Sequence, residues 1–406
     1  MNLVNMSPIK EMEIRSTKIP GVVSLAQGIP SFDTPECIKR RAIEAINEGK
    51  TARYSLSPGL LELREAIEYD LAKSEINYDF ENEIIVTAGS IEAITASFLA
   101  LLEPGDEVLI PDPTYTSYQS AIKTARGVPV FAPLNESDGW SFNIEELKSR
   151  ITKKTKAILF CNPNNPTSTV YNKEQLLEIL QLAEYHDIYV ISDEVYRDFI
   201  YNDVEFISTG KFSNFRERIV YIFSFSKAYA MTGWRVAFLA TDSKIAQKII
   251  GVHDAMVTCA PVVSQWAALA ALEMADKEII QFREKFIERK NKICKHLDEM
   301  SEWFSYVKPD SAYFVFPVFT EKLIKWLDKV EIEESSLRSD QKNSNSWKFS
   351  LKILKEAGVT VVPGVAFGPS GENHIRLCFG REDEHIDDAM KRLKKYLKET
   401  IDNVKL

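Results

Sequence analysis

The stretch RIVYIFSFSKAYAMTGWRVAFLAT, Arg218 to Thr241, combines two apolar runs with a polar segment between them. The runs RIVYIFSFS and RVAFLAT are rich in β-branched and aromatic residues, which is typical of strands. In the segment SFSKAYAMTGWR a single lysine, Lys227, is surrounded by small and hydroxylated residues, and no acidic residue is near it in the sequence. An apolar or positively charged setting favours the neutral amine, so the pattern predicts a reactive lysine. The alternative is a lysine that only ends an apolar strand.

Similar apolar runs begin at about Glu83 and alternate with longer amphipathic segments. This alternation predicts an α/β sheet of mostly parallel strands with helices on both faces. The other predicted strands are EIIVTAG, EVLIPDP, VPVFAPL, KAILFCNP and IYVISDEVY. Ligands of open α/β sheets collect at the carboxyl ends of the strands, so we expect the functional site among the polar residues that follow these runs.

The length of 406 residues, with 45% hydrophobic residues, favours two domains. The pattern turns helical between Gln265 and Met300, and a second unit of strands and helices begins at about Trp303 and ends in a helix from Glu382 to about Thr400. We therefore expect a large domain over 46–300 and a small domain over 301–406, to which the N-terminal segment 1–45 also contributes. The polar stretch from Lys329 to Ser346 is predicted to be an exposed loop or insertion.

Charge and motif composition argue against several classes of function. Acidic residues outnumber basic ones by 59 to 50, which gives a net charge of −9 and disfavours nucleic acid or an anionic membrane as a partner. The first residues carry charges and lack the apolar core of a signal peptide, so a cytoplasmic protein is expected. The five cysteines are scattered and the five histidines lack ligand spacing, so neither a disulfide framework nor a metal site is expected.

A phosphate site is indicated where TAGSIEAI follows a strand and opens a helix. The free N–H groups at such a turn, at Gly89, Ser90 and Ile91, can cradle an anion, although small residues there usually serve packing only. The hydroxyl of Ser224 and the guanidinium of Arg235 can reach the same phosphate.

Two further polar segments follow strands directly. Asp193, in IYVISDEVYRDF, comes after a wholly apolar run, so its carboxylate is poorly solvated and needs a cationic partner. The alternative is that Asp193 or Glu194 caps a helix. CNPNNPTSTV, from Cys161 to Val170, has a turn composition that no ordinary strand carries, and its alternative is a proline-rich surface turn.

In their order and spacing, SFSKAYAMTGWR, CNPNNPTSTV, DEVY and VVPGVAFGPSGENHIRLCF resemble the class I and II aminotransferases of fold type I, the aspartate aminotransferase superfamily. The resemblance runs from about Ser24 to beyond Phe379. It implies a large domain with a mostly parallel seven-stranded sheet between helices, plus a smaller α+β domain. It also implies pyridoxal 5'-phosphate as cofactor, bound to Lys227 as a Schiff base, with the same lysine moving the α-proton of the substrate.

The resemblance also implies roles for other residues. Asp193 would pair with the ring nitrogen of the cofactor, Asn165 and Tyr196 would reach its phenolic oxygen, and Tyr115 would stack on its ring. The remaining implied contacts are those of the phosphate, with Gly89, Ser90, Ile91, Ser224 and Arg235, and those of the substrate, with Arg376 at its α-carboxylate and Gly28 and Asn165 beside it. Tyr54 would reach the phosphate of the neighbouring subunit, which implies a homodimer with shared active sites.

The sequence departs from the family pattern at two positions. Ser168 stands where the NPxNPTG motif has its glycine, which puts the geometry of that turn in doubt. Ser311, in PDSAYFVF, stands where the family usually has another glycine, and nothing in the sequence shows the consequence.

The predicted activity is transfer of an amino group from an amino acid to a 2-oxo acid by a ping-pong mechanism. Some aspartate-using relatives carry a lysine at the position of Ile91, so an apolar residue there favours neutral aromatic or aliphatic donors, with 2-oxoglutarate as a candidate acceptor. One alternative is a carbon–sulfur β-lyase or an enzyme similar to aminocyclopropane-carboxylate synthase, which use the same fold and lysine. Another is a non-catalytic regulatory domain that binds the cofactor, which the acidic charge and the missing helix-turn-helix module before residue 24 disfavour.

Overall fold

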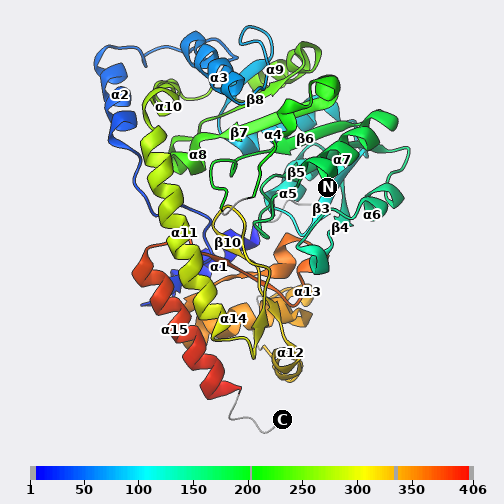
Figure 1. Ribbon diagram of the computed structural model, residues 1–406, viewed down its shortest axis with the longest axis vertical. Coiled ribbons are helices and arrows are strands. Elements are labelled where there is room, and N and C mark those ends of the chain that lie inside the picture. The colour runs from blue at the N-terminus through cyan, green and yellow to red at the C-terminus, as the bar shows by residue number, and fades with distance from the viewer. Residues whose placement is uncertain (1–5, 202–203, 333–336, 402–406) are drawn as a thin grey trace.

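The computed structural model describes residues 6–201, 204–332 and 337–401 (Figure 1). Its main element is a seven-stranded sheet with the order β2-β8-β7-β6-β5-β3-β4. Its strands are β2 (Ile84–Thr87), β3 (Glu107–Asp112), β4 (Val128–Pro133), β5 (Thr155–Cys161), β6 (Tyr189–Asp193), β7 (Ile219–Ser224) and β8 (Ala237–Thr241). All seven predicted strands are confirmed.

β8 is the strand that runs against its neighbours. It pairs antiparallel with both β7 and β2, whereas the pairs β7 to β6, β6 to β5, β5 to β3 and β3 to β4 are parallel. Between β7 and β8 the chain forms only the four-residue helix α8 (Phe225–Ala228) and the short 3-10 helix η4 (Thr232–Trp234) before it turns back. As a result Ser224, at the end of β7, lies opposite Ala237, at the start of β8. The antiparallel strand therefore brings Arg235 to the carboxyl edge of the parallel strands.

Apart from the edge strand β4, whose residues are mostly only partly buried, the sheet is buried on both faces. In β6, Val190 and Ile191 are both fully buried but belong to different hydrophobic clusters, one on each side of the sheet. Strands covered on both faces have no solvent side, which explains why their sequences are continuous apolar runs. The helices of this part are α2 (Glu36–Asn47), α3 (Leu61–Lys73), α4 (Ser90–Leu101), α5 (Ser117–Thr124), α6 (Ile144–Ser149), α7 (Lys173–Tyr185), α9 (Ser243–Val257), α10 (Val262–Met274) and α11 (Asp276–Asp298). Within the described ranges, no helix is long and apolar enough to cross a membrane.

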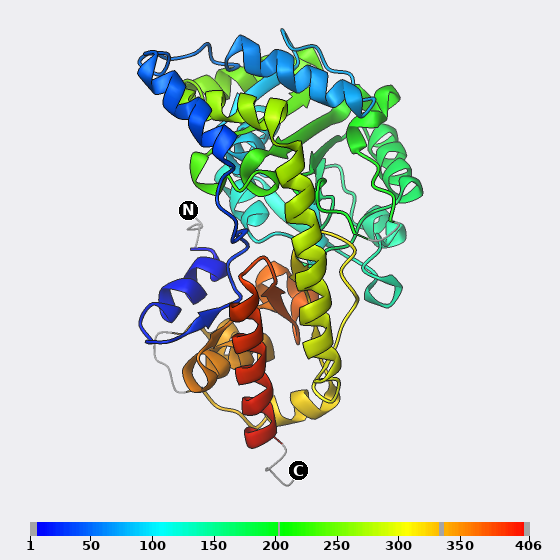
Figure 2. The ribbon, with the colours of Figure 1, turned by 60° about the vertical axis from the view of Figure 1, so that its left-hand side comes forward.

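A second, smaller group of elements lies beyond the end of the large sheet. Figure 2 shows the long helix α11 running from the large sheet down to α15, which it accompanies side by side. The helices of this part are α1 (Pro8–Ser16), α12 (Glu321–Leu327), α13 (Ser339–Asn343), α14 (Asn345–Ala357) and α15 (Asp383–Thr400). Its strands are β1 (Val23–Ser24), β9 (Phe304–Ser305), β10 (Phe314–Val315), β11 (Val318–Phe319), β12 (Val359–Thr360), β13 (Val362–Pro363) and β14 (Ile375–Cys378).

The N-terminal segment is attached to this second group. β1 pairs in parallel with β12, with Val23 opposite Val359. α15 matches the predicted terminal helix. The exact boundaries 1–45, 46–300 and 301–406 stay a prediction.

The expectation of an exposed loop from Lys329 to Ser346 is wrong for its described second half. This half contains α13, and both Gln341 and Ser346 are buried. The amide of Gln341 donates hydrogen bonds to the Glu11 carboxylate of α1 at 3.1 and 3.2 Å. Polar side chains can be buried when their hydrogen bonds are satisfied, so polarity alone was a poor guide to exposure here. Residues 333–336 of the predicted loop lie outside the described residues.

Candidate active site

A cavity of about 540 Å³ opens at the carboxyl edge of the large sheet, in the size range of sites for small molecules. Both groups of elements contribute to its wall. The predicted site residues that line it are Gly28, Ser90, Ile91, Tyr115, Asn165, Asp193, Tyr196, Ser224, Lys227, Arg235 and Arg376. The structure therefore brings together side chains from segments spread over most of the chain.

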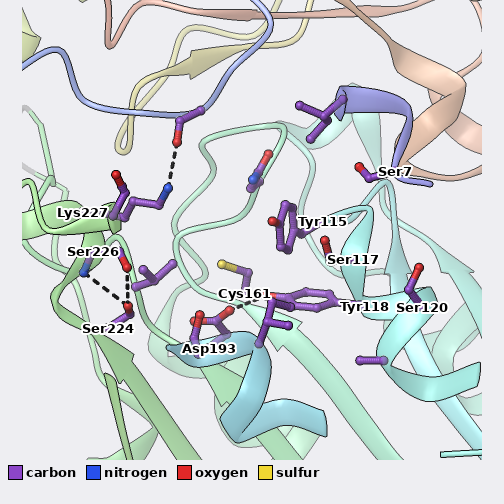
Figure 3. A pocket seen from close by; sticks show the side chains of 18 of the residues that line it. Ser7, Tyr115, Ser117, Tyr118, Ser120, Cys161, Asp193, Ser224, Ser226 and Lys227 are labelled. Carbon is purple, nitrogen blue, oxygen red and sulfur yellow. Dashed lines mark hydrogen bonds between the residues drawn. The ribbon is translucent and has the colours of Figure 1, made fainter. Parts of the chain in front are cut away.

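Lys227 lies in α8, whose first turn is capped by the hydroxyl of Ser224, which accepts from the Ser226 backbone N–H. Its Nζ donates a hydrogen bond to the carbonyl of Gly28 at 2.7 Å (Figure 3). Burial lowers the pKa of Lys227 to about 8, and the positive charges of Arg376 and Arg235 act in the same direction. Near neutral pH the uncharged amine that a nucleophilic lysine requires is therefore far more abundant than in an ordinary lysine.

Asp193 ends β6 and points into the cavity (Figure 3). Its Oδ2 accepts a hydrogen bond from the Tyr118 hydroxyl at 2.8 Å, whereas its Oδ1 is buried without a partner among the described residues. Burial raises the pKa of Asp193 to about 6, although the hydrogen bond from Tyr118 opposes this rise. A buried carboxylate with one free oxygen needs a cationic donor, and a protonated pyridine nitrogen is such a donor.

Asn165 connects the two groups of elements. Its Nδ2 donates to the Tyr196 hydroxyl at 3.4 Å, and its Oδ1 accepts from Nη1 of Arg376 at 3.2 Å. Arg376 belongs to β14, is 1% exposed, and also donates to the carbonyl of Ala26. Burial lowers the pKa of Arg376, and its Nε has no partner among the described residues. A buried guanidinium without a carboxylate partner is suited to bind the carboxylate of a ligand.

The turn before α4 is the candidate anion site. Gly89 has a φ of 95°, and a Cβ at this position would lie 2.2 Å from Nη2 of Arg235, so only glycine fits beside that guanidinium. The N–H groups of Ser90 and Ile91 open the helix and have no carbonyl partner within it. Arg235 is held by the carbonyls of Thr232 and Ala88 at 3.0 and 3.3 Å. Gly89 is therefore not part of the cavity wall but makes room for Arg235.

These features fit pyridoxal phosphate. The free oxygen of Asp193, the amine of Lys227 and the anion site at α4 match the ring nitrogen, the aldehyde and the phosphate of this molecule. Tyr115 lines the cavity between them, with its ring edge-on to Tyr118 at 5.4 Å between centroids.

The two departures from the family pattern contact each other. Ser168 has a φ of 58°, so the serine keeps the left-handed backbone that a glycine would adopt. Its hydroxyl donates to the carbonyl of Phe314 at 2.9 Å, and its own carbonyl accepts from the hydroxyl of Ser311 at 2.8 Å. Both serines are fully buried. Together they tie the turn that carries Asn165 to the β10 segment.

Tyr54, another predicted site residue, does not line the cavity either. Its side chain is 82% exposed, on the loop between α2 and α3. Its predicted role concerns a second subunit and stays a prediction.

Among the residues that sequence reasoning missed, two contact predicted site residues directly. Tyr118 holds Asp193, and Ser226 lines the cavity and contacts the Ser224 hydroxyl at 3.0 Å. The available signal for Tyr118 was its position three residues after Tyr115, at the start of a helix that follows a strand.

Comparisons with known proteins agree with this site. The family described as aminotransferase class I and II matches residues 20–393. The chain is 38% identical to an aspartate aminotransferase of Pyrococcus abyssi, over 98% of this chain and 97% of that protein. It is 36% identical to aromatic-amino-acid aminotransferase 2 of Thermococcus litoralis, with the same coverage of 98% and 97%. The crystal structure of an aromatic aminotransferase from Pyrococcus horikoshii superimposes with a TM-score of 0.84 at 38% identity, covering 96% of this chain and 99% of that one.

The seven-stranded sheet, the lysine at its carboxyl edge and the family match over nearly the whole chain lead to one conclusion. This chain belongs to the class I and II aminotransferases, and it is a transaminase of fold type I that depends on pyridoxal phosphate.

Proposed function

We propose that this transaminase takes the amino group of a neutral amino acid, aromatic or aliphatic, and passes it to a 2-oxo acid. The observation that carries the choice of donor is Ile91, which lines the cavity at the position where some aspartate-using relatives have a lysine. An acidic side chain beside Ile91 would lose hydration without gaining a charged partner there. The similarity to an aromatic-amino-acid aminotransferase agrees with this choice, whereas the 38% identity to an aspartate aminotransferase makes aspartate the competing donor to be tested.

The proposed mechanism assigns each side chain a task. Bound pyridoxal phosphate supplies a conjugated ring that takes up the electron pair released when the substrate loses its α-proton. Lys227 carries that proton, because an amine with a pKa of about 8 can both accept and donate it near neutral pH. Arg376 holds the substrate carboxylate in two parallel hydrogen bonds and so fixes the α-carbon beside Lys227.

The other assignments concern the cofactor. Asp193 pairs with the ring nitrogen and keeps it protonated, and Asn165 and Tyr196 donate hydrogen bonds to the phenolic oxygen. The N–H groups at α4, with Ser224 and Arg235, hold the phosphate. We further propose a homodimer in which Tyr54 reaches the phosphate of the partner's site, and a location in the cytoplasm.

The test is a panel of half-reactions in which the loaded enzyme meets one amino acid at a time. We expect phenylalanine, methionine or leucine to change the absorbance of the bound cofactor faster than aspartate does. Lys227→Ala serves as the control and should lose all turnover. Aspartate reacting faster than all three neutral amino acids would contradict the proposed donor class, and a fully active Lys227→Ala would contradict the role of the lysine.

A further inference from the structure

The cavity carries one more positive charge than the tasks above use. The described residues that line it include four basic side chains, of Lys10, Lys227, Arg235 and Arg376, and one carboxylate, of Asp193. In the proposed function the last three cations serve the cofactor and the substrate α-carboxylate. Lys10 has no task there, and it has no ion-pair partner among the described residues.

Lys10 lies in the first turn of α1, and the contacts of Ser7 keep this helix at the cavity. The hydroxyl of Ser7, the residue before α1, forms a hydrogen bond with the Thr116 hydroxyl at 3.2 Å. Thr116 is the residue before α5, so the starts of the two helices are joined. Figure 3 shows Ser7 across Tyr115 from Lys227. The side of the cavity remote from Lys227 is therefore the side on which α1 begins.

Hydroxyl groups line the same end of the cavity. Ser117 and Ser120 lie one turn apart on α5 and both line the cavity, near Ser7 in Figure 3. Neither hydroxyl has a hydrogen-bond partner among the described residues, whereas the neighbouring Thr124 hydroxyl donates to the Ser120 carbonyl. An ammonium group and two free hydroxyls are donors that suit a carboxylate.

We propose that Lys10, with Ser117 and Ser120, binds the distal carboxylate of a dicarboxylic 2-oxo acid and of the amino acid formed from it. The proposal rests on the proposed function, because it places the substrate α-carboxylate at Arg376 and the side chain toward α1. A dicarboxylic substrate brings one additional negative charge, which is the charge that the cavity lacks. This end of the cavity lies on the side remote from Lys227, so a five-carbon acid such as 2-oxoglutarate suits it better than a four-carbon one.

This arrangement allows neutral and acidic substrates to share one cavity. Lys10 is exposed, so its ammonium group stays hydrated when a neutral side chain is bound. A cation buried at the same place would instead be left without a partner, at a large cost in free energy. An exposed lysine at the mouth therefore adds affinity for a dicarboxylate without excluding an aromatic donor.

The test compares two half-reactions in the wild type and in Lys10→Gln, Lys10→Arg and Lys18→Gln. Lys18 is also exposed and lies just past α1 but does not line this cavity, so Lys18→Gln removes the same charge as a matched control. We expect Lys10→Gln to lower kmax/KM for glutamate about tenfold, because a hydrogen bond between charged groups is lost. The value of kmax/KM for phenylalanine should stay within about twofold of that of the wild type. Lys10→Arg should retain most of the wild-type kmax/KM for glutamate. Lys18→Gln should change kmax/KM for neither glutamate nor phenylalanine.

Binding of unreactive acids gives a readout that does not depend on turnover. In calorimetry on the loaded enzyme, Lys10→Gln should weaken the binding of glutarate about tenfold and leave the affinity for butyrate unchanged. Equal losses for glutamate and phenylalanine, or unchanged binding of glutarate, would overturn the proposal. A wild type that prefers aspartate to phenylalanine would contradict the proposed donor class, but the effect of Lys10 on dicarboxylates would still be measured separately.

Discussion

At the scale of single residues, the burial of Lys227 determines the pH at which its amine can react. Its pKa of about 8, against 10.5 for an ordinary lysine, means that the uncharged amine increases as the pH rises through about 8. We expect the enzyme stripped of cofactor to recombine with pyridoxal phosphate at a rate that increases with pH and has a midpoint near 8. Stopped-flow absorbance of the bound cofactor measures this rate. Lys227→Ala is the control, and a midpoint above 10 would contradict the prediction.

The strained turn at Ser168 leads to a prediction about stability. Ser168→Ala keeps the left-handed φ and removes the hydrogen bond to the buried Phe314 carbonyl, so it should lower the free energy of unfolding by about 1–3 kcal/mol. Ser168→Gly loses the same bond but relieves the strain, so it should be the more stable of the two by about 1 kcal/mol. Denaturant unfolding of the loaded enzyme gives the order. Equal stability of both variants would show that the strain contributes nothing.

Some residue roles could be inferred from the sequence because they presuppose a common ligand. Asp193 directly follows an apolar run and carries a charge that needs a partner, and Lys227 stands in a setting of small residues without acidic neighbours, whereas the role of Arg376 rested on the resemblance of its motif to the family. The sequence around Ser168 and Ser311 carries no such signal, because the hydroxyl of each serine donates its hydrogen bond to a backbone carbonyl of a distant segment. Such pairs depend on tertiary contacts, which local pattern does not contain.

At the scale of elements, the end of β6 and the start of α5 jointly determine the charge of Asp193. The Tyr118 hydroxyl on α5 stabilises the ionised carboxylate, and the positive ring nitrogen should bind this form. The carboxyl pKa of about 6 lies above the usual value of 3.8, so affinity for the cofactor should fall as the pH falls through about 6. In Tyr118→Phe the pKa of Asp193 should rise further. We therefore expect the midpoint of the fall in cofactor affinity to move up by about one pH unit.

The measurement is the dissociation constant of pyridoxal phosphate between pH 5 and pH 8, followed by fluorescence or absorbance. Tyr171→Phe is a suitable control, because Tyr171 is also a fully buried tyrosine but does not line the cavity. An unchanged midpoint in Tyr118→Phe would mean that its hydroxyl does not stabilise the ionised Asp193.

The elements also show where sequence patterns are sufficient. The seven strands were predictable because each is a short apolar run between turn residues, and all of them except the edge strand β4 are buried on both faces. The reversed direction of β8 was not read from the pattern, since apolar runs carry no direction. α13 was missed because its packing rests on a buried glutamine that meets Glu11 more than 300 residues away in the chain.

At the scale of the whole molecule, Tyr54 suggests that one chain does not complete its own site. Its ring is 82% exposed and lies outside the cavity, while Leu56 beside it is 72% exposed. Two neighbouring large apolar side chains on a surface loop favour contact with another protein surface. In a symmetric dimer each loop would meet the same part of its partner, so both sites would gain the same tyrosine.

If Tyr54 acts across the dimer, Tyr54→Phe should weaken cofactor binding about tenfold through loss of a hydrogen bond to the phosphate. Mixing this variant with Lys227→Ala, after dissociation and reassociation, then creates dimers in which one site has both residues. Random pairing should return about a quarter of the wild-type activity at limiting cofactor. Lys227→Ala mixed with Arg235→Gln is the control, because these residues line the same cavity of one chain and each site of the mixed dimer keeps one defect. Recovery in the control, or none in the test pair, would place Tyr54 outside the partner's site.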